Sequence, residues 1–309
     1  MSSQGIAAAG SPTPAGLTPD TPAIGEQSSH DRRKDLVFRL ALIFSISVGI
    51  LALVVLLAQV VVKGAPRLEI ATLINFPSGN PEIAGAQSAI FGTLWVIGIC
   101  ALTTIPLGVG AAIYLEEYAN RERWYNRLIE LNIQNLAAVP SIVYGILGLA
   151  FLVRGFVGLG QVVLAGALTL ALLVLPTIVI ASREAIRAVP DSIRQGSMAL
   201  GATKWQTIRR QVLPASVPGM ATGSILALSR AIGEAAPLIL LGALTFITFN
   251  PEGPTSAFTV LPIQIFNWIS RPQEEFKVLA AAAIVILLII LLAMNATAIF
   301  LRNRYQRKW

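Results

Sequence analysis

Charged residues are scarce in this sequence. Of its 309 residues only 13% are Asp, Glu, Lys or Arg, whereas 55% are hydrophobic. A water-soluble domain carries about 25% charged residues. The chain therefore has too little polar surface to cover a soluble body of its length, and we expect lipid to surround much of it.

Residues that usually build metal and catalytic sites are scarce too. The sequence has one cysteine, Cys100 in an apolar run, and one histidine, His30 in a polar N-terminal segment. This excludes a disulfide framework, a cysteine-ligated metal and a histidine-based triad within the apolar body. No Gly-x-x-x-x-Gly-Lys-Ser/Thr run occurs, so the chain has no phosphate-cradling loop of its own for ATP. We expect a protein that is not an enzyme and that binds no cofactor itself.

The N-terminal segment differs in composition from the rest of the chain. Residues 1–35 are rich in small residues, proline and polar groups, and they show no apolar period. Such a segment buries too little surface to offset its ordering entropy. The sequence therefore predicts a disordered tail over residues 1–35, followed by a membrane domain over residues 36–309.

Six apolar stretches follow the tail. A helix needs about 20 mostly apolar residues to cross a bilayer core of about 30 Å. We therefore expect an all-α fold, a polytopic membrane bundle of six transmembrane helices. The predicted spans are Leu40–Val62, Ala89–Leu115, Leu136–Val153, Val162–Ala181, Val217–Ile247 and Val278–Leu301.

The connections between these stretches differ in positive charge. Most Lys and Arg residues lie in the tail, in the 116–135 and 182–216 connections, and after the last stretch. Cytoplasmic loops carry an excess of Lys and Arg, so we expect both termini and the 182–216 loop in the cytoplasm. The formal net charge of +7 then follows from membrane topology, and nucleic-acid binding is not needed to explain it.

The longest cytoplasmic connection, residues 182–216, contains signals for two short helices. Pro190 suits the first turn of a helix. Gly201 fits the left-handed position just past a helix end. Thr203 and Gln206 have the spacing of a capping box, which predicts the start of a second helix.

The second helix of this connection has an apolar side. Trp205, Ile208 and Val212 are expected to share that side, and Pro214 and Pro218 to mark a turn back into the membrane. One interpretation is an amphipathic segment on the membrane surface, with Trp205 at the headgroups. The other is a helix that fits a groove on a cytoplasmic partner.

The fifth predicted span contains two opposite charges. Arg230 and Glu234 are four residues apart, so on a helix they share a face, and Pro237 adjoins them. Charges at bilayer depth must face protein or water. The pair is either a structural pair that fixes helix register or a positive site for a passing anion, because guanidinium matches phosphate geometry. Beside it runs a stripe of small residues suited to close helix packing: Gly219, Gly223, Ala227, Ala231 and Ala235.

The external connection over residues 248–277 is too apolar for a free loop. We expect it to contain a short amphipathic helix at the outer membrane interface, with Trp268 as an anchor. Such a helix would also close the outer end of the bundle.

Five segments of the sequence are similar to one family. They read AVPSIVYGILGL (138–149), SREAIRAVP (182–190), LGATKWQT (200–207), LSRAIGEAAPL (228–238) and FTVLPIQIFNWISRPQEEF (258–276). Together they resemble the PstA-type permease subunits of phosphate-specific ABC importers, over roughly residues 36–309. The resemblance implies the type I ABC importer permease fold, with its transmembrane core at about residues 85–301.

The cytoplasmic loop matches the docking motif of ABC-importer permeases in part. Gln195-Gly196-Ser197 takes the place of Glu-Ala-Ala, and Gln211 replaces an isoleucine, whereas the glycine and the Leu-Pro pair match. In that family the loop inserts into a cleft of the ATPase subunit. The resemblance therefore implies a coupling role for Gln195, Gly196, Ser197, Gly201, Ala202, Thr203, Trp205, Leu213 and Pro214.

Function and partners are implied in the same way. The chain would form, with a second related permease, the path for inorganic phosphate across a bacterial plasma membrane. An ATPase homodimer would carry ATP and magnesium, and an extracytoplasmic phosphate-binding protein would contact the outer connection. Arg230, Glu234 and Pro237 would lie on the path.

Other transport classes remain open from the residues alone. A permease for another oxyanion, such as molybdate or sulfate, would share the docking loop. A secondary transporter often shows repeated halves with discontinuous helices, and the sequence shows no convincing repeat. An ion channel would need a selectivity filter from identical subunits.

Overall fold

The computed structural model describes residues 29–120, 122–243 and 246–305. It divides into two units, residues 1–56 and residues 57–309. In the first unit the described residues belong to α1 (Ser29–Gly64). Residues 29–35 are helical, so the prediction of disorder is wrong for them; their Arg and Lys are good helix formers and let the helix continue before the apolar stretch. The rest of the predicted tail lies outside the described residues.

The regular secondary structure in the described part of the second unit is helical, apart from one isolated β-bridge between Val162 and Ala257. This confirms the predicted all-α fold. Its elements are η1 (Ala65–Arg67), α2 (Ile70–Ile74), α3 (Gln87–Ile113), η2 (Tyr114–Tyr118), α4 (Trp124–Ala137), α5 (Ser141–Leu147), η3 (Gly148–Val153), α6 (Val163–Arg187), α7 (Asp191–Ala199), α8 (Lys204–Thr207), η4 (Ile208–Val212), α9 (Leu213–Ile232), α10 (Ala236–Leu241), α11 (Leu261–Ile269) and α12 (Glu274–Tyr305).

Five helical segments within the described residues are long and apolar enough to cross a membrane. Their bounds are Arg33–Arg67, Gln87–Tyr118, Val163–Arg187, Lys204–Ile232 and Glu274–Arg304. A sixth span results only if α4 and the α5–η3 segment are counted together. The prediction of six spans therefore holds if this bent pair crosses the membrane once.

The predicted third span is not a single straight helix. α4 begins at Trp124, and the chain bends by 104° between α4 and Ser141–Val153. Pro140 stands at the bend. It has no N–H group, and it disfavours a helical conformation at Val139, so α4 cannot continue into α5.

The predicted fifth span is broken near its C-terminal end. α9 ends at Ile232, a turn follows, and α10 runs from Ala236 to Leu241. Pro237 stands in the first turn of α10, where its missing N–H costs nothing, whereas inside a longer helix it would remove a backbone bond to Gly233. The apolar composition continues across this break, so the sequence predicts one helix there.

The other end of the fifth span is more continuous than expected. No turn occurs at Pro214 or Pro218; α8, η4 and α9 form one uninterrupted segment, Lys204–Ile232. η4 is a π-helical turn, and such local adjustments accommodate the missing N–H of proline inside membrane helices. We call the 182–216 connection the docking loop. Its second helix is therefore the beginning of a membrane helix.

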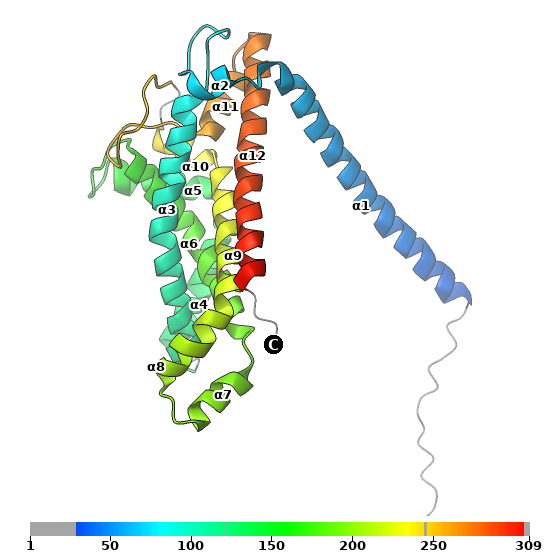
Figure 1. The fold of residues 1–309 in the computed structure, drawn as a ribbon, viewed down its shortest axis with the longest axis vertical. Coiled ribbons are helices and arrows are strands. Elements are labelled where there is room, and N and C mark those ends of the chain that lie inside the picture. The colour runs from blue at the N-terminus through cyan, green and yellow to red at the C-terminus, as the bar shows by residue number, and fades with distance from the viewer. Residues whose placement is uncertain (1–28, 121, 244–245, 306–309) are drawn as a thin grey trace, which may run out of the picture. The chain divides into compact units, whose positions relative to one another are not determined.

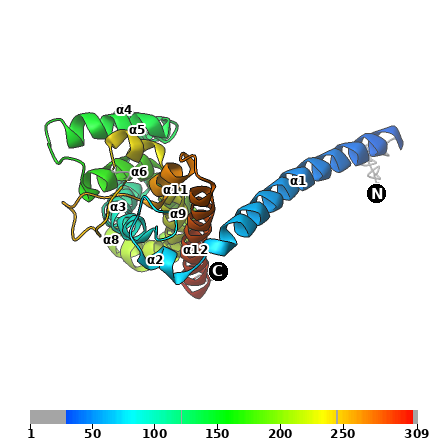
Figure 2. The ribbon, with the colours of Figure 1, turned by 90° about the horizontal axis from the view of Figure 1, so that it is seen from above.

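The long helices of the second unit lie side by side (Figure 1), and Figure 2 shows them nearly end-on. α6 packs against α3 and α9, and α12 packs against α9. α9 approaches α6 closely where its glycines lie. A Cβ atom added at Gly223 would lie only 2.5 Å from the Cβ of Ala181, and one added at Gly219 only 2.8 Å from the Cβ of Ala185. Two members of the predicted small-residue stripe thus form a packing face.

The short helix expected in the outer connection is present as α11. Trp268 is completely buried, in an apolar cluster with Leu261, Phe276 and Leu279. The prediction of a headgroup anchor is therefore wrong, because the indole side chain is surrounded by protein. α11 instead closes one end of the bundle.

Candidate functional site: a charge pair and a docking loop

The charge pair lies where α9 ends. Arg230 is in the last turn of α9, and Glu234 follows the helix end; Arg230 Nε is 3.6 Å from Glu234 Oε1. The two side chains thus lie together as predicted, although the helix breaks between them. The Arg230 side chain is 72% exposed, and that of Glu234 is mostly covered.

The surroundings of the pair place it at mid-depth in the bundle. Arg230 and Glu234 line a recess with Val174 and Thr177, which are near the middle of α6. Within the described residues Arg230 makes this loose ion pair and no hydrogen bond, so its N–H donors remain available.

Pro237, the third residue predicted for the path, lies elsewhere. It is buried, and a Cβ atom added at Gly145 of α5 would lie 2.7 Å from its Cα. It does not line the recess of the charge pair. Pro237 thus packs α10 against α5.

Around this region, as in the rest of the described chain, no group of three or more His, Cys, Asp and Glu could hold a metal ion.

The bend of the docking loop has the predicted geometry. Gly201 has a φ of +84°, in the left-handed region. The Thr203 side chain accepts a hydrogen bond from the backbone N–H of Gln206, and the Gln206 side-chain oxygen accepts one from the backbone N–H of Thr203. The predicted glycine bend and capping box are both confirmed.

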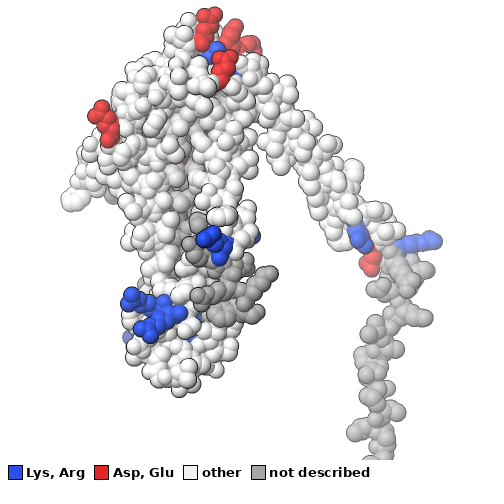
Figure 3. All heavy atoms as spheres, in the orientation of Figure 1, with Lys and Arg blue, Asp and Glu red and all other residues white. Residues whose placement is uncertain are grey.

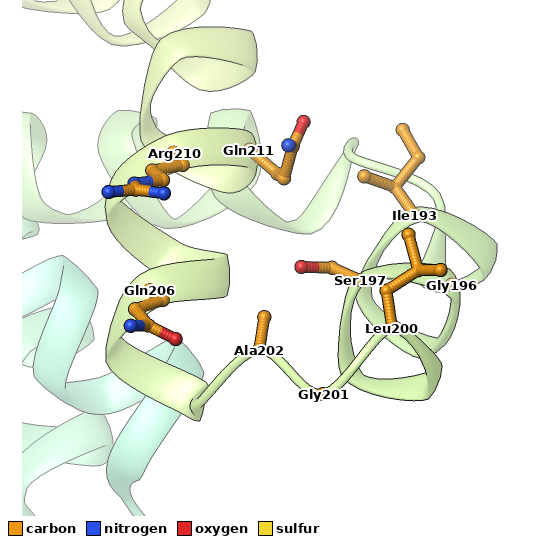
Figure 4. Close-up of a pocket in the computed structure, with 9 residues that line it drawn as sticks. All are labelled: Ile193, Gly196, Ser197, Leu200, Gly201, Ala202, Gln206, Arg210 and Gln211. Atoms are coloured by element: carbon orange, nitrogen blue, oxygen red, sulfur yellow. The ribbon is translucent and has the colours of Figure 1, made fainter.

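The loop encloses a cleft of about 550 Å³ between α7 and the α8–η4 segment (Figure 4). Four of the predicted docking residues line it: Gly196, Ser197, Gly201 and Ala202. Ser197 lies toward α8, and its hydroxyl is 2.9 Å from that of Thr207, which connects the two helices.

The other predicted docking residues lie around this cleft. Gln195 and Trp205 are exposed beside it, Thr203 caps α8, and Leu213 and Pro214 begin α9. The prediction that Trp205 shares one side with Ile208 and Val212 is wrong, because Trp205 is exposed whereas the other two are buried. The bundle covers this helix only from Thr207 onward, so the first turn of α8 protrudes.

The tip of the loop exposes apolar side chains. Leu200 is 92% exposed, and Met198 and Trp205 are about half exposed. Neighbouring exposed apolar residues of this kind mark contact surfaces.

An ion-pair network, which sequence reasoning missed, fastens the loop to the bundle. Arg194 of α7 donates from Nε and Nη2 to Glu117 Oε1, at 3.1 and 2.9 Å. It also donates to the carbonyl oxygens of Ile186, at 2.9 Å, and Val189, at 2.6 Å. Arg194 therefore joins α7 to η2 and to the end of α6.

The neighbouring carboxylate, Glu116, binds the end of α6. Arg187 donates from Nε and Nη2 to the two Glu116 oxygens, each at 3.1 Å. Arg183 Nε lies 3.5 Å from Glu116 Oε2, and its Nη2 donates to Glu130 of α4 at 2.9 Å. Each of these partners is more than fifty residues away along the chain, and no local period signals such contacts.

On the face that Figure 3 shows, charge is distributed unequally between the ends of the second unit. Lys and Arg atoms gather over α8 and the C-terminal end of α12, whereas Asp and Glu atoms gather near the start of α12 (Figure 3). The docking loop therefore lies at the basic end.

Comparisons with known proteins agree with this architecture. The family described as "Binding-protein-dependent transport system inner membrane component" matches residues 104–305. "Probable ABC transporter permease protein YqgI" of Bacillus subtilis is 34% identical over 76% of this chain and 79% of its own length. "Phosphate transport system permease protein PstA" of Yersinia pestis is 32% identical over 86% of this chain and 91% of its own length.

The fold is also found among solved structures. A chain of a bacterial alginate ABC transporter, solved in complex with its alginate-bound periplasmic protein, superimposes with a TM-score of 0.64 at 17% identity. The match covers 92% of this chain and 99% of that chain. At this identity the likeness shows the fold alone.

Proposed function

Because this chain belongs to the family of binding-protein-dependent transport system inner membrane components, we propose that it is a permease subunit for inorganic phosphate. It is a multi-pass membrane protein and a transport component. With a second, related permease chain it forms the path across a bacterial plasma membrane. An ATPase homodimer in the cytoplasm, which carries ATP and magnesium, drives it.

The observation that carries this proposal is the exposed guanidinium of Arg230 at mid-depth. A charge facing acyl chains at the centre of a helix costs about 2.5–3.5 kcal/mol on insertion scales. The 72% of the Arg230 side chain that this chain leaves uncovered must therefore face water or a second permease. A cation with free N–H donors in such a place suits a tetrahedral oxyanion.

The substrate is supported by the relatives. The Yersinia pestis protein named as a phosphate transport system permease aligns with most of this chain, including residues around the charge pair. The pair is loose, which suits passage, because a conduit must release its cargo. Tight binding then belongs to a separate phosphate-binding protein outside the cell, which docks at the outer end near α11.

The docking loop is the site for the ATPase. Its tip exposes Leu200, Met198 and Trp205 beside a cleft, at the basic end of the unit. Cytoplasmic regions carry the excess of Lys and Arg, so this end lies in the cytoplasm. The segments before the first span and after the last span are rich in Lys and Arg as well, which by the same rule assigns both termini to the cytoplasm.

Substitution of Arg230 tests the path. We expect Arg230→Gln to lower phosphate uptake roughly 10- to 150-fold, since a hydrogen bond to a charged group contributes about 1.5–3 kcal/mol. Uptake is measured in proteoliposomes that contain the whole complex, with copurification of the ATPase as the measure of assembly. Arg230→Lys keeps the charge and should retain part of the uptake.

Arg302→Gln is the matched control, because Arg302 is an exposed arginine at the end of α12. Normal uptake in Arg230→Gln would contradict the assignment of the path. Competition by sulfate or molybdate, but not by phosphate, would contradict the substrate. Purification without any ATPase would contradict the importer class and favour a secondary transporter.

A further inference from the structure

The ion pair between Arg194 and Glu117 at the docking loop is more buried and makes more hydrogen bonds than an exposed surface ion pair. The side chains of Arg194 and Glu117 are 16% and 8% exposed, and they share two hydrogen bonds. Arg194 also holds two backbone carbonyl groups of the α6–α7 connection. A guanidinium bound in this way is fixed in both distance and orientation.

The two carboxylates of the network are consecutive residues of η2, the π-helical end of α3. Consecutive residues of a helix point in different directions, in a π-helical turn as in an α-helix. Glu117 therefore meets α7, whereas Glu116 meets Arg183 and Arg187 at the end of α6. One turn of helix thus contacts both the docking loop and the helix that precedes it.

The other attachments of α7 are less directional. Ile193 packs against an apolar cluster that includes Ala112, Ile186 and Val212, and burial of this kind has no directional preference. Ser197 meets Thr207 through a hydroxyl pair. Of the described contacts, the Arg194 contact is the charged one that joins α7 to α3.

On the premise of the proposed function, we propose that the Arg194–Glu117 pair transmits movement of the docking loop to α3. Arg183 and Arg187, through Glu116, make the ends of α3 and α6 move with it as one body. The loop then acts on the bundle by two routes. One is the continuous segment Lys204–Ile232, which ends at the charge pair, and the other is this ionic joint to α3. Arg194 and Glu117 are positioning residues that do not contact the cargo.

The test measures two quantities separately: the phosphate carried per ATP hydrolysed, and the retention of the ATPase subunits in the complex. Glu117→Gln, Arg194→Gln and the charge-exchanged double variant Glu117→Arg/Arg194→Glu are reconstituted as whole complexes. We expect both single variants to retain the ATPase subunits and basal ATP hydrolysis, but to carry less phosphate per ATP hydrolysed. The double variant should recover part of that ratio, because it restores the ion pair but not the two hydrogen bonds from residue 194 to the backbone carbonyl groups. Lys277→Gln, which removes an exposed ion pair with Glu274 at the other end of the unit, is the control and should leave the ratio unchanged.

The outcomes separate this inference from the proposed function. A wild-type complex without ATPase subunits or phosphate uptake would defeat the proposed function before any variant is compared. A wild-type complex that transports, with normal ratios in the single variants, would overturn the joint alone. Loss of the ATPase from the single variants would also overturn it, because the pair would then only shape the docking surface.

A milder variant keeps the test decisive if the glutamine variants do not fold. Arg194→Lys retains the positive charge but cannot make the same paired hydrogen bonds. We expect it to assemble and to show a reduced ratio of phosphate to ATP. An unchanged ratio in Arg194→Lys would overturn the proposal.

Discussion

Gly201 determines the shape of the docking loop through its backbone alone. Its φ is +84°, and a Cβ atom added there would meet nothing within 4 Å. A side chain would therefore encounter no clash with other residues, but a left-handed conformation costs a non-glycine residue roughly 1–2 kcal/mol.

We expect Gly201→Val to weaken binding of the ATPase, because the strained backbone straightens and the tip is displaced. Gly201→Asn is the matched control, since asparagine tolerates the left-handed region. Copurification of the ATPase at increasing salt measures the difference. Equal retention in the two variants would mean that the glycine bend does not position the docking surface.

Residues whose roles depend on local spacing were the predictable ones. Gly201, Thr203 and Gln206 lie within one helix boundary, and Glu234 is four positions after Arg230. The sequence alone therefore indicated both arrangements. Arg194 and Glu117 gave no such signal, because their contact depends on how α7 folds back onto the end of α3.

Among the helices, the close packing that the stripe of small residues predicts is realised between α9 and α6. Gly223 has no room for a methyl group, since its added Cβ would lie 2.5 Å from the Cβ of Ala181. Overpacking of this kind costs about 1–3 kcal/mol. Gly98 of α3 is also helical, but nothing lies within 4 Å of its added Cβ.

We therefore expect Gly223→Ala to lower the unfolding temperature of the complex in detergent, and Gly98→Ala to leave it unchanged or to raise it. Alanine is otherwise favoured over glycine inside a helix by about 0.8–1.0 kcal/mol. A thermal unfolding assay in one detergent compares the two. The same temperature for both would show that the α9–α6 contact relaxes without cost.

Apolar runs predicted where helices exist better than where they break. The sequence indicated the helical spans, yet it joined α9 to α10 and missed the sharp bend after α4. Pro140 and Pro237 mark both breaks, but Pro176 and Pro218 lie inside intact helices. Whether a proline interrupts a helix depends on the neighbours that satisfy the freed carbonyl group, and those neighbours are not visible in the sequence.

For the whole molecule, the unequal distribution of charge predicts its orientation. Cys100 is the one cysteine of the sequence and is buried in α3, so added cysteines can be labelled against a low background. Gly79, between α2 and α3, and Ser192, in α7, are both exposed. Their segments lie at opposite ends of the bundle in Figure 1.

We expect a membrane-impermeant maleimide to label Gly79→Cys in intact cells whose outer layers have been removed. Ser192→Cys should react only after the membrane is permeabilised, because the basic end faces the cytoplasm. The reverse pattern would invert the topology, and the docking loop could then not reach an ATP-hydrolysing partner.

The uninterrupted helix from Lys204 to Ile232 also restricts how this chain can change in length. Each residue added to a helix advances everything beyond it by 1.5 Å and rotates it by about 100°. One insertion within α9 would therefore turn the guanidinium of Arg230 out of its recess while leaving the loop tip in place. On the proposed function, residues can be gained or lost in the turns between helices, but the number of residues between the docking loop and Arg230 has to stay constant.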